Sequence, residues 1–369
     1  MTQSPFRSGP VPASMDEFEQ QLSPPAPEPA ASATPQHAAA PVPQTDEVRN
    51  PWIAQQQETP SWAPVPRPAA PAGPAPMLRE RRLVPDSGAR RLVHVLTGGL
   101  VNLGPSAVQV RERERMRRIQ RPLRGAHVTT YLCLKGGIAK TSTCAGTALT
   151  AAAHRPEAVV AGDFNPDAGD LAERVLGREG LAGVNRLAEQ VDRVHSIAEL
   201  SRFLETEGRL TVLPGEPDPQ LGESLSSHQF NAVIEVLSCY YSSIHVDAGT
   251  GITHPIMPGI LARTDTLVVP AAYSITGAKR AADTLKWLRN NKFERLADSA
   301  IVALTAKDQV SRDVDKAAVR AQFDGASLVV VPQDPHLADG ALVRLDRMQP
   351  GTREAFAEIA ALIADRYRG

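Results

Sequence analysis

One stretch of this sequence decides its fold: Val128-Thr-Thr-Tyr-Leu-Cys-Leu-Lys-Gly-Gly-Ile-Ala-Lys-Thr-Ser142. An apolar run leads into a glycine pair and a Lys-Thr pair, and a helical pattern follows. Because glycines lack Cβ, the backbone can close around an anion with its N–H groups pointing inward, and the helix dipole adds to that field. The stretch therefore predicts a strand, a phosphate-binding loop and a helix. A glycine-rich turn before an ordinary helix is the alternative.

The Lys-Thr pair fits a bound nucleotide with Mg²⁺. Lys140 would reach the β- and γ-phosphates, and Thr141 would offer its hydroxyl to the metal ion. The predicted nucleotide-binding residues form one continuous segment: Lys135, Gly136, Gly137, Ile138, Ala139, Lys140, Thr141 and Ser142.

The lysine ahead of the glycine pair makes this loop resemble the deviant Walker A loop of the ParA/MinD family, whose usual form is Lys-Gly-Gly-x-Gly-Lys-Thr. The resemblance implies ATP and Mg²⁺ as cofactors. It also implies a homodimer in which Lys135 reaches the partner's nucleotide, so Lys135 is a predicted catalytic residue. Two positions depart from the pattern: Ala139 replaces the family's glycine, and Leu134 replaces the first glycine of the general P-loop. If the Ala139 backbone requires a positive φ, its methyl group would weaken binding.

The second predicted strand, 158–163, ends in polar residues that suit water and Mg²⁺. Its end resembles the family's switch I, Asp-x-Asp-Pro: Asp163 matches the first aspartate, and Asn165 replaces the second, which in the family positions the hydrolytic water. An amide can orient water but cannot act as a base. We therefore predict Asp163 and Asn165 as catalytic residues and expect slow hydrolysis, unless Asp167 substitutes. An Asn-Pro-Asp turn with capping carboxylates remains the alternative.

The fourth predicted strand, Ser243-Ile-His-Val-Asp247, has the form of a Walker B strand, an apolar run that ends in one aspartate. Such an aspartate holds Mg²⁺ through water, so Thr141 and Asp247 are the predicted metal-site residues. The pattern is common by itself and gains weight from its place after the phosphate loop. His245 lies inside the strand, and we expect it to be packed.

Near the C-terminal end, Val329-Val-Val-Pro332-Gln-Asp334 resembles the family's last-strand loop, which lies against the adenine. Pro332 and Asp334 are therefore predicted nucleotide contacts. Thr305 and the two residues after it stand where the family commonly places Asn for the base, which leaves adenine recognition from that strand open. A simple turn is the alternative.

From residue 126 onward, short apolar runs alternate with helical patterns, which predicts an α/β domain with a mostly parallel sheet covered on both faces by helices. Together with the loop, the resemblance to the ParA/MinD family implies a P-loop NTPase of the SIMIBI type. Predicted strands are 128–134, 158–163, 210–213, 243–247, 266–270, 300–304 and 328–331. Predicted helices are 140–153, 229–240, 277–290, 312–323 and 352–368.

The N-terminal third has a different composition. The first 80 residues hold 18 of the 32 prolines, so we expect a disordered Pro/Ala-rich tail over 1–78. An Arg-rich, partly helical linker over 79–125 carries 12 arginines and 4 acidic residues, and the ATPase domain spans 126–369. The cluster Arg111–Arg124 is interpreted as a solvated helix face, with nucleic-acid binding as the alternative.

No run approaches the roughly 18 apolar residues of a membrane span, and the three cysteines have no metal-type spacing. We expect a cytoplasmic protein that reaches the inner face of a membrane only through a partner. The chain further resembles the MinD-like proteins of type VII (ESX) secretion, which have a similar Pro/Ala-rich tail and Asp-Ala-Gly-Thr-Gly after the Walker B strand. That likeness implies a regulatory or accessory ATPase with secretion-system partners. A degenerate nucleotide-binding scaffold and a DNA-associated partitioning ATPase are the alternatives.

Overall fold

The computed structural model describes residues 88–98, 100–134, 139–166, 169–181, 183–216, 225–249, 251, 254–306, 315–323, 326–338, 340 and 342–367. These residues belong to two compact units, one that ends at Gly104 and one that begins at Pro105. The predicted tail, Lys135–Ile138 of the phosphate loop and Asp167 lie outside the described residues.

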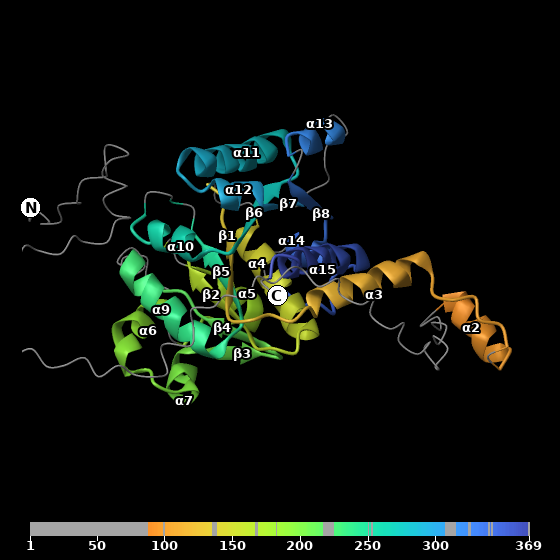
Figure 1. Ribbon diagram of the computed structural model, residues 1–369, viewed down its shortest axis with the longest axis horizontal. Helices are drawn as coiled ribbons and strands as arrows, with labels where there is room; N and C mark the ends of the chain where they lie inside the picture. The colour runs from red at the N-terminus through yellow and green to blue at the C-terminus, as the bar shows by residue number, and fades with distance from the viewer. Residues whose placement is uncertain are drawn as a thin grey trace, which may run out of the picture. The chain divides into compact units, whose positions relative to one another are not determined.

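The larger unit is built on a sheet whose described strands follow the order β3-β4-β2-β5-β1-β6-β7-β8 (Figure 1). Neighbouring strands pair in parallel, except that β3 runs antiparallel to β4. All residues of the central strands β1, β2 and β5 are buried, as expected for a parallel sheet covered on both faces. The strands are β1 (His127–Tyr131), β2 (Val159–Phe164), β3 (Glu205–Glu207), β4 (Leu210–Leu213), β5 (Ser243–Ala248), β6 (Thr266–Ala272), β7 (Ile301–Thr305) and β8 (Ser327–Val331).

Helices cover the sheet on two sides and create two hydrophobic cores. One core joins the sheet to α4 (Lys140–His154), α5 (Leu171–Leu176) and α15 (Pro350–Ala364). The other core lies under a larger set of helices: α6 (Val184–Gln190), α7 (Ile197–Leu200), α9 (Ser227–Tyr240), α10 (Met257–Arg263), α11 (Ile275–Asn290), α12 (Glu294–Asp298) and α13 (Lys316–Ala321). A short helix, α14 (Pro335–Ala338), follows β8. The predicted fold class is therefore confirmed.

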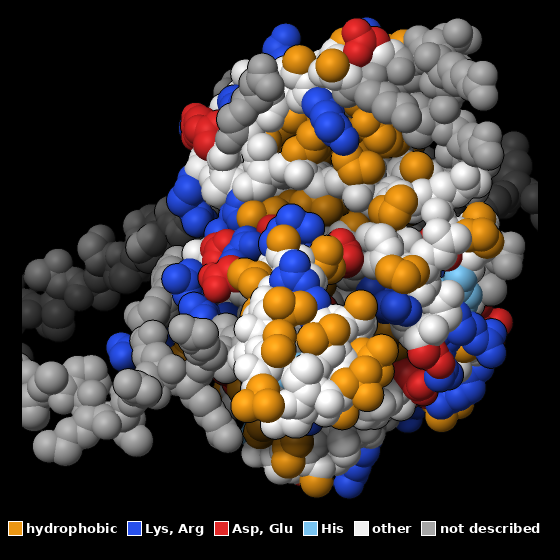
Figure 2. Space-filling model, turned by 90° about the vertical axis from the view of Figure 1, so that its right-hand side faces the viewer, with side chains coloured by type: hydrophobic (Ala, Val, Ile, Leu, Met, Phe, Trp, Pro, Cys, Tyr) orange, Lys and Arg blue, Asp and Glu red, His pale blue; other side chains and the backbone are white. Residues whose placement is uncertain are grey.

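The arginine-rich segment forms α3 (Ala107–Ile119), which packs against α15. Ile119 is fully buried among alanines of α15. Arg115 and Arg118 pair with Glu358 at 3.0 Å and 2.9 Å, and Arg118 also pairs with Asp365 at 2.7 Å. Lys and Arg side chains lie beside Asp and Glu side chains on the face shown in Figure 2. The helix is present as expected, but the side that faces α15 is packed and not solvated.

A buried arginine joins the end of α3 to the end of α4. The Arg155 side chain is 1% exposed, and its guanidinium donates to the carbonyls of Ile119 and Arg121 and to the Glu157 carboxylate. It also lies 4.6 Å from the centre of the Tyr367 ring. Because the other end of α4 begins at the phosphate loop, α4 spans the distance between the loop and the docked helix α3.

The smaller unit contains α2 (Gly88–Leu96) and the loop that follows it. The loop is held to the helix by hydrogen bonds between His94 Nδ1 and the Val101 carbonyl (3.2 Å) and from Thr97 Oγ1 to the Val93 carbonyl (2.7 Å). None of the described helices has the length and hydropathy needed to cross a bilayer.

Candidate functional site

The predicted phosphate loop meets α4 at Ala139, whose backbone is left-handed (φ 62°, ψ 34°). This conformation costs an L-residue about 1 kcal/mol or more, and glycine adopts it freely. The sequence raised the question of whether Ala139 requires a positive φ, and the structure answers that it does. Ala139, the N-cap residue of α4, has no side chain that could accept from the first N–H groups, so these donors can serve an anion.

Replacing Ala139 with glycine should therefore stabilise the chain by about 0.5–1 kcal/mol, because the strain at a positive φ is removed. Ala153→Gly is the matched control, since Ala153 is an exposed residue of the same helix and glycine there should destabilise by a similar amount. Urea unfolding of both variants measures the two effects. Equal destabilisation by both substitutions would contradict the strained geometry at Ala139.

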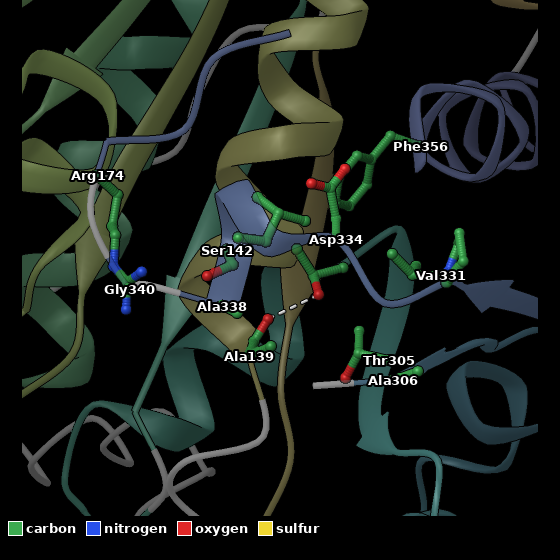
Figure 3. Close-up of a pocket in the computed structure, with 13 residues that line it drawn as sticks. Ala139, Ser142, Arg174, Thr305, Ala306, Val331, Asp334, Ala338, Gly340 and Phe356 are labelled. Carbon is green, nitrogen blue, oxygen red and sulfur yellow. Dashed lines mark hydrogen bonds between the residues drawn. The ribbon is translucent and has the colours of Figure 1, made fainter. Parts of the chain in front are cut away.

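The first turn of α4 is held in place by Thr143. Its hydroxyl donates to the Ala139 carbonyl at 2.7 Å (dashed line, Figure 3), and its backbone N–H donates to the same oxygen at 2.9 Å. Lys140 and Thr141 lie half-buried at the start of the helix, and Ser142 is 8% exposed. The predicted residues Ala139–Ser142 are thus gathered at one helix end.

Two buried aspartates lie on neighbouring strands at the carboxyl edge of the sheet. Asp163 of β2 and Asp247 of β5 are register partners, and they are 0% and 1% exposed. Asp163 accepts the backbone N–H groups of Asn165 (3.1 Å) and Leu171 (3.0 Å). Both carboxylate oxygens of Asp247, in contrast, have no hydrogen-bond partner among the described residues.

Burial raises the pKa values of both aspartates. Burial raises the pKa of Asp163 to about 6, and the pKa of Asp247 rises well above its usual value because of burial and the Asp163 charge. The Thr141 hydroxyl and the Lys140 charge act in the opposite direction on Asp247. Two carboxylates so placed resist joint ionisation without a compensating cation.

The unpaired Asp247 oxygens and the nearby Thr141 hydroxyl fit a hydrated Mg²⁺ ion, which prefers oxygen ligands and keeps several waters. Among the described residues, no group of three or more His, Cys, Asp or Glu side chains forms a metal site. The protein would therefore supply few ligands, and a nucleotide's phosphates would supply others.

The segments after β2 and β5 touch each other. A Cβ added at Gly249 would lie 2.8 Å from Asn165 Oδ1 and 2.6 Å from Pro166 Cδ, and a Cβ at Gly169 would lie 2.0 Å from the Asp163 carboxylate. Glycine is needed at both positions for this close approach. The predicted residues Asp163, Asn165 and Asp247 are therefore brought together, because β2 and β5 are neighbouring strands of the sheet.

A pocket of about 150 Å³ lies beside the first turn of α4 (Figure 3). It is smaller than the roughly 300–1,000 Å³ typical of small-molecule sites, so it can hold only part of a nucleotide. Both predicted residues of the last-strand loop line it. Its lining comes from five parts of the chain: Ala139, Ser142, Thr143, Arg174, Thr305, Ala306, Val331, Pro332, Asp334, Leu337, Ala338, Gly340 and Phe356.

The Asp334 carboxylate is occupied by the protein's own backbone. It is 4% exposed and accepts the N–H groups of His336 (3.0 Å) and Gln349 (2.8 Å). These bonds hold the turn into α14 and the start of α15. We infer that Asp334 shapes this wall of the pocket through its backbone bonds.

Buried His245 confirms the expectation of a packed residue. It is 1% exposed, and its two ring nitrogens lie 2.9 Å from the Tyr131 hydroxyl and 3.2 Å from the Ser243 hydroxyl. Burial lowers the pKa of His245 to about 3, so the ring is neutral at physiological pH. It supports the sheet beneath Asp247.

Two of the pocket residues that the sequence did not indicate are Arg174 of α5 and Phe356 of α15. Each belongs to an amphipathic or very short helix, where an arginine or an apolar residue carries no local signal for a ligand. Only the tertiary arrangement brings them to the end of α4.

Comparison with known proteins supports the fold. No protein-family profile matches the chain. The ESX-1 secretion-associated protein EspI of Mycobacterium tuberculosis is 30% identical over 300 residues, which cover 78% of this chain. The chain spans 43% of EspI's length.

Among solved structures, a ParA family ATPase from Chlorobium tepidum has a TM-score of 0.55 at 18% identity and covers 64% of this chain and 98% of its own. The septum site-determining protein MinD from Pyrococcus horikoshii, complexed with Mg-ADP, has a TM-score of 0.52 at 19% identity, with coverages of 64% and 94%. The chain therefore has the fold of the ParA/MinD ATPases, and it is similar to an ESX-associated protein, as the sequence predicts.

Proposed function

We propose that this chain is an ATP-binding, slowly hydrolysing dimerisation switch that acts as a regulatory or accessory ATPase of type VII (ESX) secretion. The observation that carries the proposal is the pair Asp163 and Asp247. Two buried carboxylates lie near Thr141 and Lys140 at the start of α4, and the oxygens of one of them, Asp247, make no hydrogen bond to the described residues. Phosphates and a cation bound there would compensate them.

Each residue of the site has a task in this mechanism. Lys140 and the N–H groups at the start of α4 hold the β- and γ-phosphates, and Thr141 and Asp247 hold Mg²⁺ directly or through water. The ion would neutralise part of the negative charge of the phosphates and of the buried aspartates. Asn165 orients the attacking water but cannot take its proton, so hydrolysis is slow.

Dimerisation would follow from incomplete neutralisation of the γ-phosphate in one subunit. Lys135 of each copy would reach the other copy's phosphates, so ATP stabilises the dimer and its hydrolysis releases it. The segments after β2 and β5 touch each other, and a change at either one would alter the surface offered to a partner. We propose secretion-system proteins as those partners, met in the cytoplasm or at the inner face of the membrane.

Two observations bear on the alternatives. The strained Ala139 and the amide at Asn165 favour a scaffold that binds nucleotide without hydrolysing it. The ion pairs of Arg115 and Arg118 with α15 occupy arginines that a DNA-binding surface would need free. The scaffold is therefore the second candidate.

Light scattering tests the switch. ATP with Mg²⁺ should double the mass of the wild-type chain, whereas Lys135→Ala should still bind ATP and remain a monomer, because it removes only the charge that crosses the interface. Lys279→Ala, which removes an exposed lysine of α11, is the control and should dimerise normally. A wild-type chain that binds ATP and stays monomeric would rule out the switch and favour the scaffold.

A further inference from the structure

Arg174 places a guanidinium at the pocket beside α4, and neither the sequence motifs nor the proposed mechanism uses it. The residue lies on α5, the short helix after β2, and its side chain points toward Gly340 (Figure 3). A Cβ added at Gly340 would lie 3.5 Å from Nη1 of Arg174, and Gly340 has a positive φ of 69°. The segment after α14 thus passes close to the guanidinium.

The position of Arg174 is fixed by two bonds. Nε donates to the Asp170 carboxylate at 2.8 Å, one helical turn away, and the Arg174 carbonyl accepts the Val343 N–H at 2.6 Å. The side chain is only 19% exposed. An arginine held in this way has already lost much of its rotamer freedom, which lowers the cost of binding a ligand.

The terminal nitrogens of Arg174 are free of hydrogen bonds to the part of the chain that the structure describes. Nη1 and Nη2 donate to no acceptor among the described residues, although both belong to a mostly buried side chain at a cavity. A guanidinium in that state is a ready donor for a phosphate or hydroxyl oxygen, and its planar fork suits two bonds at once.

Three other polar groups of the pocket are already bonded within the protein. Thr305 Oγ1 donates to the Ala271 carbonyl at 3.1 Å, the Ala306 N–H donates to the Val331 carbonyl at 3.0 Å, and the Asp334 carboxylate holds two backbone N–H groups. Arg174, in contrast, lines the pocket with charged donors that make no hydrogen bond to the described residues.

We propose that Arg174 is a nucleotide-binding residue, whose Nη1 and Nη2 donate to a phosphate or ribose oxygen of a nucleotide that enters the pocket from the start of α4. Asp170 holds the guanidinium through Nε. The proposal rests on the proposed nucleotide-binding function and adds to it a nucleotide contact from α5.

Calorimetric titration of the full chain with ATP and Mg²⁺ tests this role. Arg174→Gln should weaken ATP binding about 10- to 100-fold, the loss expected for hydrogen bonds from a charged donor. Arg174→Lys should recover part of the loss, since it keeps the charge and loses the fork. Arg178→Gln is the matched control, because Arg178 lies just beyond α5, is 53% exposed and pairs with Glu205 away from the pocket. Thermal unfolding of each variant checks that the fold is kept.

Titration with 2′,3′-dideoxy-ATP separates the two oxygen sources. If Arg174 binds the ribose, the wild type loses affinity for the dideoxy compound and Arg174→Gln does not; if it binds a phosphate, the substitution costs the same with both compounds. If a folded Arg174→Gln chain binds ATP as tightly as the wild type, the role of Arg174 is overturned and the proposed function still stands. A wild type that binds no nucleotide would overturn the proposed function and this inference together.

Discussion

Asp247→Asn should stabilise the nucleotide-free chain by about 1–3 kcal/mol and abolish the binding of ATP with Mg²⁺. Asp247 is buried beside Asp163 and has no hydrogen-bond partner among the described residues, so its charge opposes folding. An asparagine of the same shape carries no charge and can donate to Asp163. The same change removes a carboxylate that the site needs for the metal ion, so stability and function move in opposite directions.

The free energy of unfolding should fall as the pH rises, because the pKa of Asp163 is higher in the folded state. The pKa of Asp163 is raised from 3.8 to about 6, so the folded state binds this proton more tightly than the unfolded state does. The resulting stability is fully present below the unfolded value of 3.8 and is lost as the pH rises through about 6. In Asp247→Asn the loss should be smaller, because the second carboxyl group with a raised pKa is gone.

Urea unfolding at pH 5 and pH 7.5 measures both effects, with Asp298→Asn as the control. Asp298 is an exposed aspartate paired with Arg289, and its substitution should change stability by less than about 0.5 kcal/mol at either pH. A nucleotide-free wild type that is more stable than Asp247→Asn at pH 7.5 would contradict the account of the aspartate pair.

Arg155→Met should destabilise the chain by about 3 kcal/mol and release α3 from the domain. The substitution leaves the carbonyls of Ile119 and Arg121 without their charged donor and removes the contact with the Tyr367 ring. Methionine fills part of the space but donates no hydrogen bond. Because trypsin cuts after arginine and α3 contains several arginines, release should speed cleavage within α3.

Limited trypsin digestion and urea unfolding read out the two effects. Arg117→Met is the control, since Arg117 is 82% exposed, pairs with Glu114 within α3 and should contribute less than about 0.5 kcal/mol. Unchanged protection of α3 in the Arg155→Met chain would show that the ion pairs to Glu358 and Asp365 are sufficient to dock it.

The sheet was predictable because its strands are apolar throughout and its main helices have a clear period. The predicted strand 210–213 coincides with β4, and the helix predicted over 140–153 differs from α4 by one residue. Strand β3 was missed because its three residues, Glu-Thr-Glu, are polar and carry no hydrophobic signal. Its pairing depends on β4, which is a tertiary contact that the local sequence does not encode.

Sequence motifs indicated the residues at the strand ends, and the structure places Asp163, Asn165 and Asp247 close together. The motifs did not indicate that the Asp334 carboxylate accepts backbone N–H groups or that Arg174 reaches the pocket. The first depends on how a turn closes, and the second depends on a helix packed against α4. Neither property belongs to a local pattern, so both required the folded chain.

The central claim is that Lys140, the start of α4 and the aspartate pair together bind ATP with Mg²⁺. Calorimetric titration of the full chain, wild type against Lys140→Ala, tests it most directly. The account predicts Mg²⁺-dependent binding by the wild type and a loss of at least about 100-fold in the variant, because a charge-assisted contact to the phosphates disappears. Equal affinity in the two chains, or no binding by the wild type, would contradict it.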